Sequence, residues 1–309
     1  MLESQTPVLR RRLEGAEAEL EFPVLVEFRK TGLTDWLGLL HSFGWLAPSL
    51  SSRQLGMISS WSTDRPGGFT DAELVLLQEL VAGLALAVKA ATSYDITRGL
   101  LSTYLGADAA EHVLAGEVRR GQVQEMRVVL FFADLRGFTQ IADELGADNL
   151  VGLLDDYLDC IGLPVHESGG QVLKFMGDGL LATFALGGDE AAVCDHALAA
   201  ARGTQAAVAA LNARRAANDL PILKLDVALH LGTVMYGNVG TGDRLDFTVV
   251  GPAVNEASRI ETLCDQVGRP ILASDSFRAV AVNSWNGLES LGIWKLRGVS
   301  DAMEIFVVT

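Results

Sequence analysis

Cysteine and clustered histidine are scarce in this chain of 309 residues. The three cysteines are an odd number, and their spacing matches neither a disulfide framework nor a zinc site. The five histidines are equally dispersed and form no recognisable ligand cluster. We therefore expect Cys160, Cys194 and Cys264 to be small buried residues in a reducing cytoplasm.

Positive charge is scarce as well. Lys and Arg number 24 against 39 Asp and Glu, which gives a net charge of −15 at pH 7. A nucleic-acid or anionic membrane surface needs clustered Lys and Arg, so the composition argues against both kinds of partner. A polyanionic substrate would need a local positive site or a metal ion.

Long apolar runs are missing too. The segment most like a membrane span, residues 74–88, is interrupted by Gln78 and Glu79 and falls short of the ~20 apolar residues that a span requires. Near the N-terminus, three arginines are followed by an acidic stretch rather than by the apolar segment of a signal peptide. We expect a soluble, cytoplasmic protein without a membrane span.

What is present is enough chain for two domains, each with its own core. In the first part, helix-compatible residues come before short apolar runs that are separated by Ser, Pro and Gly. This pattern predicts a helix over residues 1–20 and strands over residues 21–27, 36–40 and 54–61.

A longer helix is predicted to begin at Thr70, because Thr70 and Glu73 form a capping box ahead of an apolar stripe. Strands followed by a helix that begins Phe69-Thr70-Asp71-Ala72-Glu73 resemble the C-terminal part of a GAF sensor domain. We expect an α+β domain over residues 1–92 that senses an unknown small-molecule or protein signal. A domain used only for dimerisation is the alternative.

Residues 93–121 carry two short helical patterns punctuated by Gly106 and Gly116, and they connect the two halves of the chain. A stiff helical linker of this kind can act as a transducer that relays a change of packing. A passive spacer is the alternative.

The second half is organised around an apolar run, residues 128–133, that predicts a buried strand ending at Asp134. Gly137, Phe138 and Thr139 then open an amphipathic helix. Backbone N–H groups at a helix start next to a fixed carboxylate suit a cation placed between the carboxylate and a phosphate. A strand-to-helix turn with a capping Asp is the simpler alternative.

The order of predicted elements after residue 122 is β-α-α-β-β-α-β-β-β-α-β. It indicates an α+β fold with a central, largely antiparallel sheet and helices mainly on one side. Asp178 lies in a Gly-Asp-Gly turn between two of these strands. Two acidic strand termini in one domain are the minimum for binding two divalent cations, although most such turn residues have no further role.

Three ordered motifs in residues 122–309 together resemble a class III nucleotidyl cyclase catalytic domain. The resemblance implies the nucleotidyl cyclase fold, which has a ferredoxin-like palm core. The motifs are Phe132-Ala133-Asp134-Leu135-Arg136-Gly137-Phe138-Thr139, Lys174-Phe175-Met176-Gly177-Asp178-Gly179 and Gly251-Pro252-Ala253-Val254-Asn255-Glu256-Ala257-Ser258-Arg259.

The resemblance also implies a role for each matched position. Asp134 and Asp178 are expected to hold two Mg²⁺ or Mn²⁺ ions per site, with the Leu135 carbonyl as a further ligand. Gly137, Phe138 and Thr139 would cradle the triphosphate of ATP. Lys174 and Thr248 would select adenine, Asn255 would orient the ribose, and Arg259 would stabilise charge on the phosphates.

Spacing supports part of this assignment without the resemblance. Asn255 and Arg259 are four residues apart on a predicted helix, so both project from one face. A surface pair between Arg259 and Glu256 is the alternative role for that arginine. The Cα atoms of Lys174 and Asp178 would lie ~13 Å apart on an extended strand, which is too far for both side chains to bind the same phosphate or metal directly. This suits the family arrangement, in which a head-to-tail homodimer shares its sites between protomers.

We therefore expect an adenylate cyclase that forms 3′,5′-cyclic AMP and pyrophosphate from ATP. No side chain stands out as a general base. A guanylate cyclase, a non-catalytic nucleotide-binding module and one half of a heterodimer are the alternatives. Lys174 disfavours the first, and the complete set of matched residues disfavours the other two.

Overall fold

The computed structural model describes residues 7–15, 18, 20–46, 54–145, 147–281 and 287–308. The chain divides into two compact units, Met1–Leu100 and Leu101–Thr309, which are considered separately below. The domain boundaries expected at residues 92 and 121 stay predictions.

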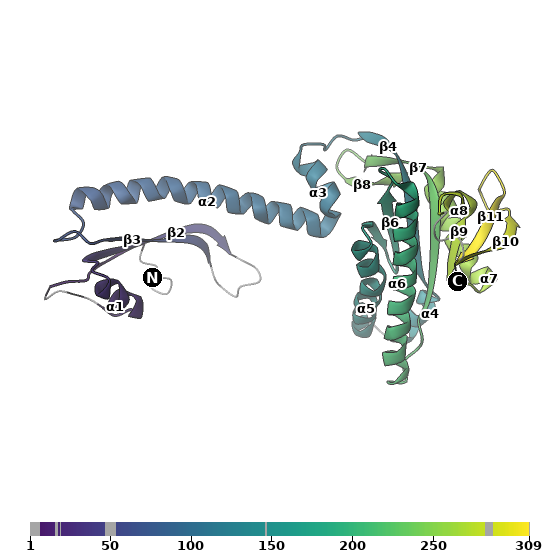
Figure 1. Cartoon of the computed structure of the whole chain (residues 1–309), viewed down its shortest axis with the longest axis horizontal. Helices are drawn as coiled ribbons and strands as arrows, with labels where there is room; N and C mark the ends of the chain where they lie inside the picture. The colour runs from purple at the N-terminus through teal and green to yellow at the C-terminus, as the bar shows by residue number, and fades with distance from the viewer. Residues whose placement is uncertain are drawn as a thin grey trace. The chain divides into compact units, whose positions relative to one another are not determined.

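The first unit contains a three-stranded antiparallel sheet in the order β1-β2-β3. One face packs Trp36 against Leu25 of α1, and the other packs Leu37 and Leu39 against Val81 of α2. Figure 1 accordingly shows α1 and α2 on opposite sides of this sheet. The elements are β1 (Val8–Arg12), α1 (Pro23–Lys30), β2 (Asp35–Leu46), β3 (Gln54–Thr63) and α2 (Asp71–Leu105).

Two expectations for this unit were wrong. The region predicted as a helix, residues 1–20, contains strand β1, because β1 pairs with β2 and Arg10 Nη2 lies 2.6 Å from the buried carboxylate of Asp35. The region predicted as a strand, residues 21–27, contains the start of helix α1, where Pro23 suits the first turn. In both cases the local sequence pattern was too weak to decide between helix and strand. Residues 1–6, 16, 17 and 19 lie outside the described part of the chain.

Other expectations for this unit are confirmed. Strands β2 and β3 cover the segments predicted around residues 36–40 and 54–61. The capping box is formed, since the Thr70 N–H donates to Glu73 Oε2 at 2.8 Å and the Glu73 N–H donates to Thr70 Oγ1 at 3.4 Å. The resemblance to a GAF domain stays a prediction.

Helix α2 is longer than its capping signal alone indicates. The first helical pattern of residues 93–121 is the end of α2, and the second is α3 (Ala107–Leu114), with Gly106 between them at φ 86°. By length and composition α2 could cross a membrane, and 11% of its most apolar window is buried. The absence of a membrane span therefore stays a prediction.

The second unit is built on an eight-stranded sheet in the order β10-β11-β9-β7-β4-β6-β5, with β8 paired to β7. Its strand pairs are antiparallel except β7 with β9, as the sequence predicts for a largely antiparallel sheet. The strands are β4 (Val123–Arg136), β5 (Gln171–Met176), β6 (Gly179–Ala185), β7 (Lys224–Gly240), β8 (Leu245–Val250), β9 (Ile271–Ser274), β10 (Leu288–Trp294) and β11 (Met303–Val308).

Helices cover this sheet mainly on one face. Alternate residues of β4, such as Phe131 and Ala133, pack with α5, α6 and α8 in the main core. Val128 and Leu130 point the other way and pack with α7. The helices are α4 (Phe138–Leu145), α5 (Ala147–Glu167), α6 (Glu190–Ala216), α7 (Pro252–Val267) and α8 (Asp275–Val280).

Two details differ from the sequence prediction. The predicted order has three strands between its third and fourth helices, whereas the structure has two there, because β7 runs without a break through Gly232. Gly232 is needed there for close packing rather than for a turn, because a Cβ at this position would lie 2.5 Å from Ala253 Cβ of α7. Helix α8 was not predicted; the Ser274 side chain caps it by accepting from the Phe277 N–H at 3.2 Å.

Candidate active site

The two predicted metal ligands meet at one end of the sheet. Asp134 lies near the end of β4, and Asp178 lies in the turn that joins β5 to β6. Register pairs Ala133 with Leu180, so this turn comes beside Asp134. Gly179 makes the approach possible, because a Cβ there would lie 3.0 Å from Asp134 Oδ1. The two carboxyl groups are close enough that the charge of Asp178 acts on Asp134.

The electrostatics of this pair favour a cation. Burial and then the charge of Asp178 raise the pKa of Asp134 to about 6. Burial also raises the pKa of Asp178. Crowded carboxylates are the oxygen ligands that Mg²⁺ and Mn²⁺ prefer, so the residues present fit the expected metal. The Leu135 backbone N–H opposes the rise in pKa of both carboxyls, and a ligand role for the Leu135 carbonyl stays a prediction.

The predicted phosphate cradle follows Asp134 directly. Gly137 adopts a φ of 74°, which turns the chain from β4 into α4, and its carbonyl accepts from the Gln140 and Ile141 N–H groups. The first N–H groups of a helix have no intrahelical partner. Those of Phe138 and Thr139 therefore stand at the start of α4, four and five residues beyond Asp134.

A β-bulge sets the direction of Lys174. The register between β5 and β6 shifts between Val172 and Lys174, which places Lys174 opposite Leu181. Leu181 belongs to the cluster that packs with α7, so Lys174 projects from that same face of the sheet. Alternation along β4 puts Asp134 on this face too.

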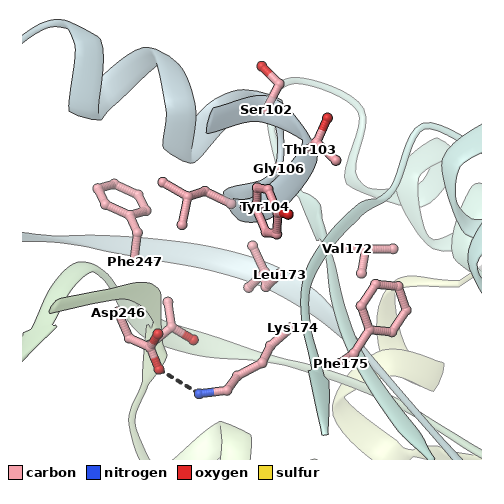
Figure 2. Close-up of a pocket in the computed structure, with 12 residues that line it drawn as sticks. Ser102, Thr103, Tyr104, Gly106, Val172, Leu173, Lys174, Phe175, Asp246 and Phe247 are labelled. Carbon is pink, nitrogen blue, oxygen red and sulfur yellow. Dashed lines mark hydrogen bonds and ion pairs between the residues drawn. The ribbon is translucent and has the colours of Figure 1, made fainter. Parts of the chain in front are cut away.

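Lys174 has a partner that the sequence did not reveal. Its Nζ lies 2.5 Å from Asp246 Oδ2, as Figure 2 shows. Asp246 and Thr248 are two residues apart on β8 and share a face of that strand. They line, with Lys174, a pocket of about 410 Å³. The structure thus brings the two predicted base-selecting residues together and adds a carboxylate between them. The only sequence signal for Asp246 was its two-residue offset from Thr248.

Helix α7 presents Asn255 and Arg259 to solvent. Ala253, Ala257 and Ile260 are buried and hold the opposite side of the helix on the sheet. Glu256, which could have paired with Arg259, instead has Oε2 3.0 Å from His230 Nε2. Within the described part of the chain, no hydrogen bond or ion pair engages Asn255 or Arg259, so the surface-pair alternative lacks its partner.

A single chain does not bring the metal ligands and Thr248 into one place. Asp134 lies opposite Asp226 near the start of β7, whereas Thr248 lies opposite Gly237 near its end. Figure 1 shows α4 and β8 at opposite ends of the sheet accordingly.

A buried acidic residue near the metal ligands was not predicted from the sequence. Glu261 of α7 is 8% exposed, and burial followed by the charges of Asp134 and Asp226 raises its pKa to about 8. Arg136 neutralises part of this charge, since its Nε lies 2.8 Å from Asp226 Oδ2. Glu261 lies two residues after Arg259, and nothing in the sequence alone indicates that it is buried.

Comparisons with known proteins match the second half of the chain. The family described as "Adenylate and Guanylate cyclase catalytic domain" matches residues 122–309. The adenylate cyclase of Anabaena cylindrica is 34% identical over 198 residues, which are 61% of this chain and 38% of that protein. The chain thus spans well under half the length of this relative.

Two solved structures resemble the second half of the chain. The adenylyl cyclase CyaB from P. aeruginosa has 26% identity and a TM-score of 0.55, over 61% of this chain and 96% of that one. The guanylyl cyclase Cya2 also has 26% identity, with a TM-score of 0.53 over 60% of this chain and 93% of that one. With the family match over residues 122–309, the chain therefore belongs to the adenylate and guanylate cyclase catalytic domain family.

Proposed function

We propose that this chain is an adenylate cyclase that converts ATP to 3′,5′-cyclic AMP and pyrophosphate. The observation that carries the proposal is that the turn with Asp178 lies beside Asp134 at the end of the sheet, ahead of the helix that begins at Phe138. Lys174 supports ATP as the substrate, because an ammonium donates to N1 of adenine, whereas N1 of guanine carries a proton.

Asp134 and Asp178 would hold two Mg²⁺ or Mn²⁺ ions. Divalent cations supply Lewis acidity, which lowers the pKa of a bound hydroxyl and neutralises charge on leaving phosphates. In the reaction the ribose 3′-oxygen forms a bond to the α-phosphorus, and the bond between that phosphorus and the bridging oxygen to the β-phosphorus breaks. Pyrophosphate leaves, and the hydroxyl proton passes to solvent.

The chain's own residues bind and position the nucleotide. Asn255 would orient the ribose, and the permanently charged fork of Arg259 suits phosphate oxygens. The N–H groups of Phe138 and Thr139 would bind the triphosphate. Lys174 and Thr248 would bind the edge of the base. Most of the rate enhancement then comes from positioning and charge neutralisation.

We further propose a symmetric head-to-tail homodimer. Asp134 and Thr248 lie at opposite ends of β7, so one nucleotide would take its metals from one protomer and its base-binding residues from the partner. Two copies of one chain related by a two-fold axis would build two such sites. Activity would then require dimerisation.

The first unit would regulate this activity. Helix α2 runs without a break from the small sheet to Leu105, which offers a continuous element for relaying a signal. A GAF-like sensor of an unknown ligand, in a cytoplasmic protein, is the arrangement we propose. Comparing the full chain with residues 122–309 at equal dimer fraction tests it, and equal activity of the two would contradict regulation.

The direct test of the proposed reaction is Asp134→Ala in the full chain, with cyclic AMP measured in Mg²⁺ and in Mn²⁺. We expect loss of cyclic AMP formation with an unchanged circular dichroism spectrum. Substantial remaining turnover would contradict the two-metal proposal. The similarity to the guanylyl cyclase Cya2 keeps GTP as the second candidate substrate, and rates on ATP and GTP decide between them.

A further inference from the structure

The last turn of α2 forms one wall of the pocket that contains Lys174. Residues Ser102 to Gly106 line this pocket of about 410 Å³ together with β5 and β8 (Figure 2). The turn lies against β5, because a Cβ on Gly106 would be 3.4 Å from the Val172 carbonyl oxygen. It belongs to the same compact unit as the pocket's other residues.

Helix α3 holds this wall in place. Its Asp108 carboxylate accepts a hydrogen bond from the Tyr236 hydroxyl of β7. His112 stacks on Phe247 of β8 with ring centroids 5.1 Å apart, and its Nδ1 lies 2.8 Å from Glu117 Oε2. The position of the last turn of α2 is therefore fixed by contacts with the strands that carry the base-selecting residues.

Three aromatic side chains line the pocket, and one of them is largely exposed and has no ring partner among the described residues. Phe247 already stacks on His112 and meets the edge of Tyr236 at 4.8 Å. Phe175 lies opposite Leu180 of the main core, so it projects from the other face of β5 and points away from Lys174 in Figure 2. Tyr104 remains, and it is 83% exposed.

A nucleobase has an edge and two faces, and the pocket offers polar groups for the edge. Lys174 can donate to ring nitrogens, and Asp246 and Thr248 can accept from an amino group. The faces of a base need a flat apolar partner, and stacking on an aromatic ring is the usual solution. In Figure 2 the Leu173 side chain lies next to Lys174, and the ring of Tyr104 lies on the far side of Leu173.

We propose that Tyr104 is a substrate-contacting residue whose ring stacks on the nucleobase of the bound nucleotide. This rests on the proposed function for the substrate and adds a residue outside the cyclase motifs. Its consequence is that the connecting helix α2 touches the substrate itself. Movement of α2 would then change nucleotide binding directly.

The test compares Tyr104→Ala with Tyr104→Phe in the full chain, with Tyr94→Ala as the matched control. Tyr94 is also on α2 and is 56% exposed, but it does not line the pocket. Binding of α,β-methylene-ATP and of inorganic tripolyphosphate, which has no base, is measured by calorimetry with Mg²⁺ present. KM and kcat for ATP and the molecular mass in solution are measured on the same samples.

Stacking is worth about 1–3 kcal/mol per base, so we expect Tyr104→Ala to weaken binding of the ATP analogue about tenfold and to raise KM more than it lowers kcat. Tyr104→Phe and Tyr94→Ala should bind as the unchanged protein does. Tripolyphosphate binding and the molecular mass should not change in any variant.

Three results would overturn the inference: normal analogue binding by Tyr104→Ala, equal loss of tripolyphosphate binding, or loss of dimer. The last would make Tyr104 a contact between copies. If the unchanged protein binds the analogue but forms no cyclic nucleotide, the proposed function fails while the stacking test still gives its answer. If it binds no nucleotide, both proposals are wrong.

Discussion

Lys174 Nζ and Asp246 Oδ2 lie 2.5 Å apart across the pocket between β5 and β8, and both side chains are about half exposed (46% and 51%). An exposed ion pair contributes under about 1 kcal/mol to folding. Because this pair includes Lys174 and lies near Thr248, the two predicted base-selecting residues, we expect it to matter for binding rather than for stability.

We expect Asp246→Asn to leave the thermal midpoint almost unchanged and to lower kcat/KM for ATP about tenfold, because a charge-assisted hydrogen bond near the base is weakened. The rate on GTP should fall less. Asp243→Asn, an exposed carboxylate in the same hairpin, is the matched control. Equal losses on ATP and GTP would mean that Asp246 does not take part in base selection.

Removing one carboxyl from the metal pair should stabilise the metal-free protein. Asp134 is disfavoured as a carboxylate by burial and by Asp178, which raises its pKa to about 6. Because the pair is partly exposed, we expect Asp178→Asn to raise the free energy of unfolding in EDTA by only about 1 kcal/mol. Adding Mg²⁺ or Mn²⁺ should stabilise the unchanged protein but not the variant. A variant that is less stable than the unchanged protein in EDTA would contradict the predicted repulsion between Asp134 and Asp178.

Glu261 should make stability depend on pH. Its pKa is raised to about 8 by burial and by Asp134 and Asp226, so the folded state keeps a proton that the unfolded state releases near pH 4.5. The contribution of Glu261 to the free energy of unfolding is therefore most favourable below pH 4.5, and it falls as the pH rises towards 8. In Glu261→Gln this fall should be absent, with a gain on the order of 2 kcal/mol at pH 8. Urea unfolding of both proteins at pH 5 and pH 8 in EDTA measures this difference. The same change in stability with pH in both proteins would contradict the raised pKa of Glu261.

Arg259 should matter for turnover and not for folding. It is exposed on α7 and unpaired among the described residues, so Arg259→Ala should keep its thermal midpoint. Loss of a donor to developing phosphate charge should lower kcat by about 100-fold. Arg269→Ala, an exposed arginine just beyond the same helix, should keep full activity. A fall in stability without a fall in kcat would assign Arg259 a structural role.

A structural feature of this chain can be predicted from the sequence when the residues that determine it lie close together in the chain. The strand that ends at Asp134 and the turn at Asp178 follow from apolar runs and glycines, which act within a few residues. The strand β1 and the ion pair of Asp246 depend on partners far away in sequence, Asp35 and Lys174, so no local pattern predicts them. The need for glycine at position 232 comes from Ala253 of α7, which is likewise distant in sequence.

The shared site is the central claim, and mixing two inactive variants tests it most directly. Asp134→Ala lacks a metal ligand and Arg259→Ala lacks a phosphate ligand. In an equal mixture half of the dimers contain one copy of each, and each mixed dimer has one intact site of two. The account predicts that cyclic AMP formation recovers to about a quarter of the rate of the unchanged protein. If both residues serve a site within one protomer, the mixture will stay as inactive as either variant alone.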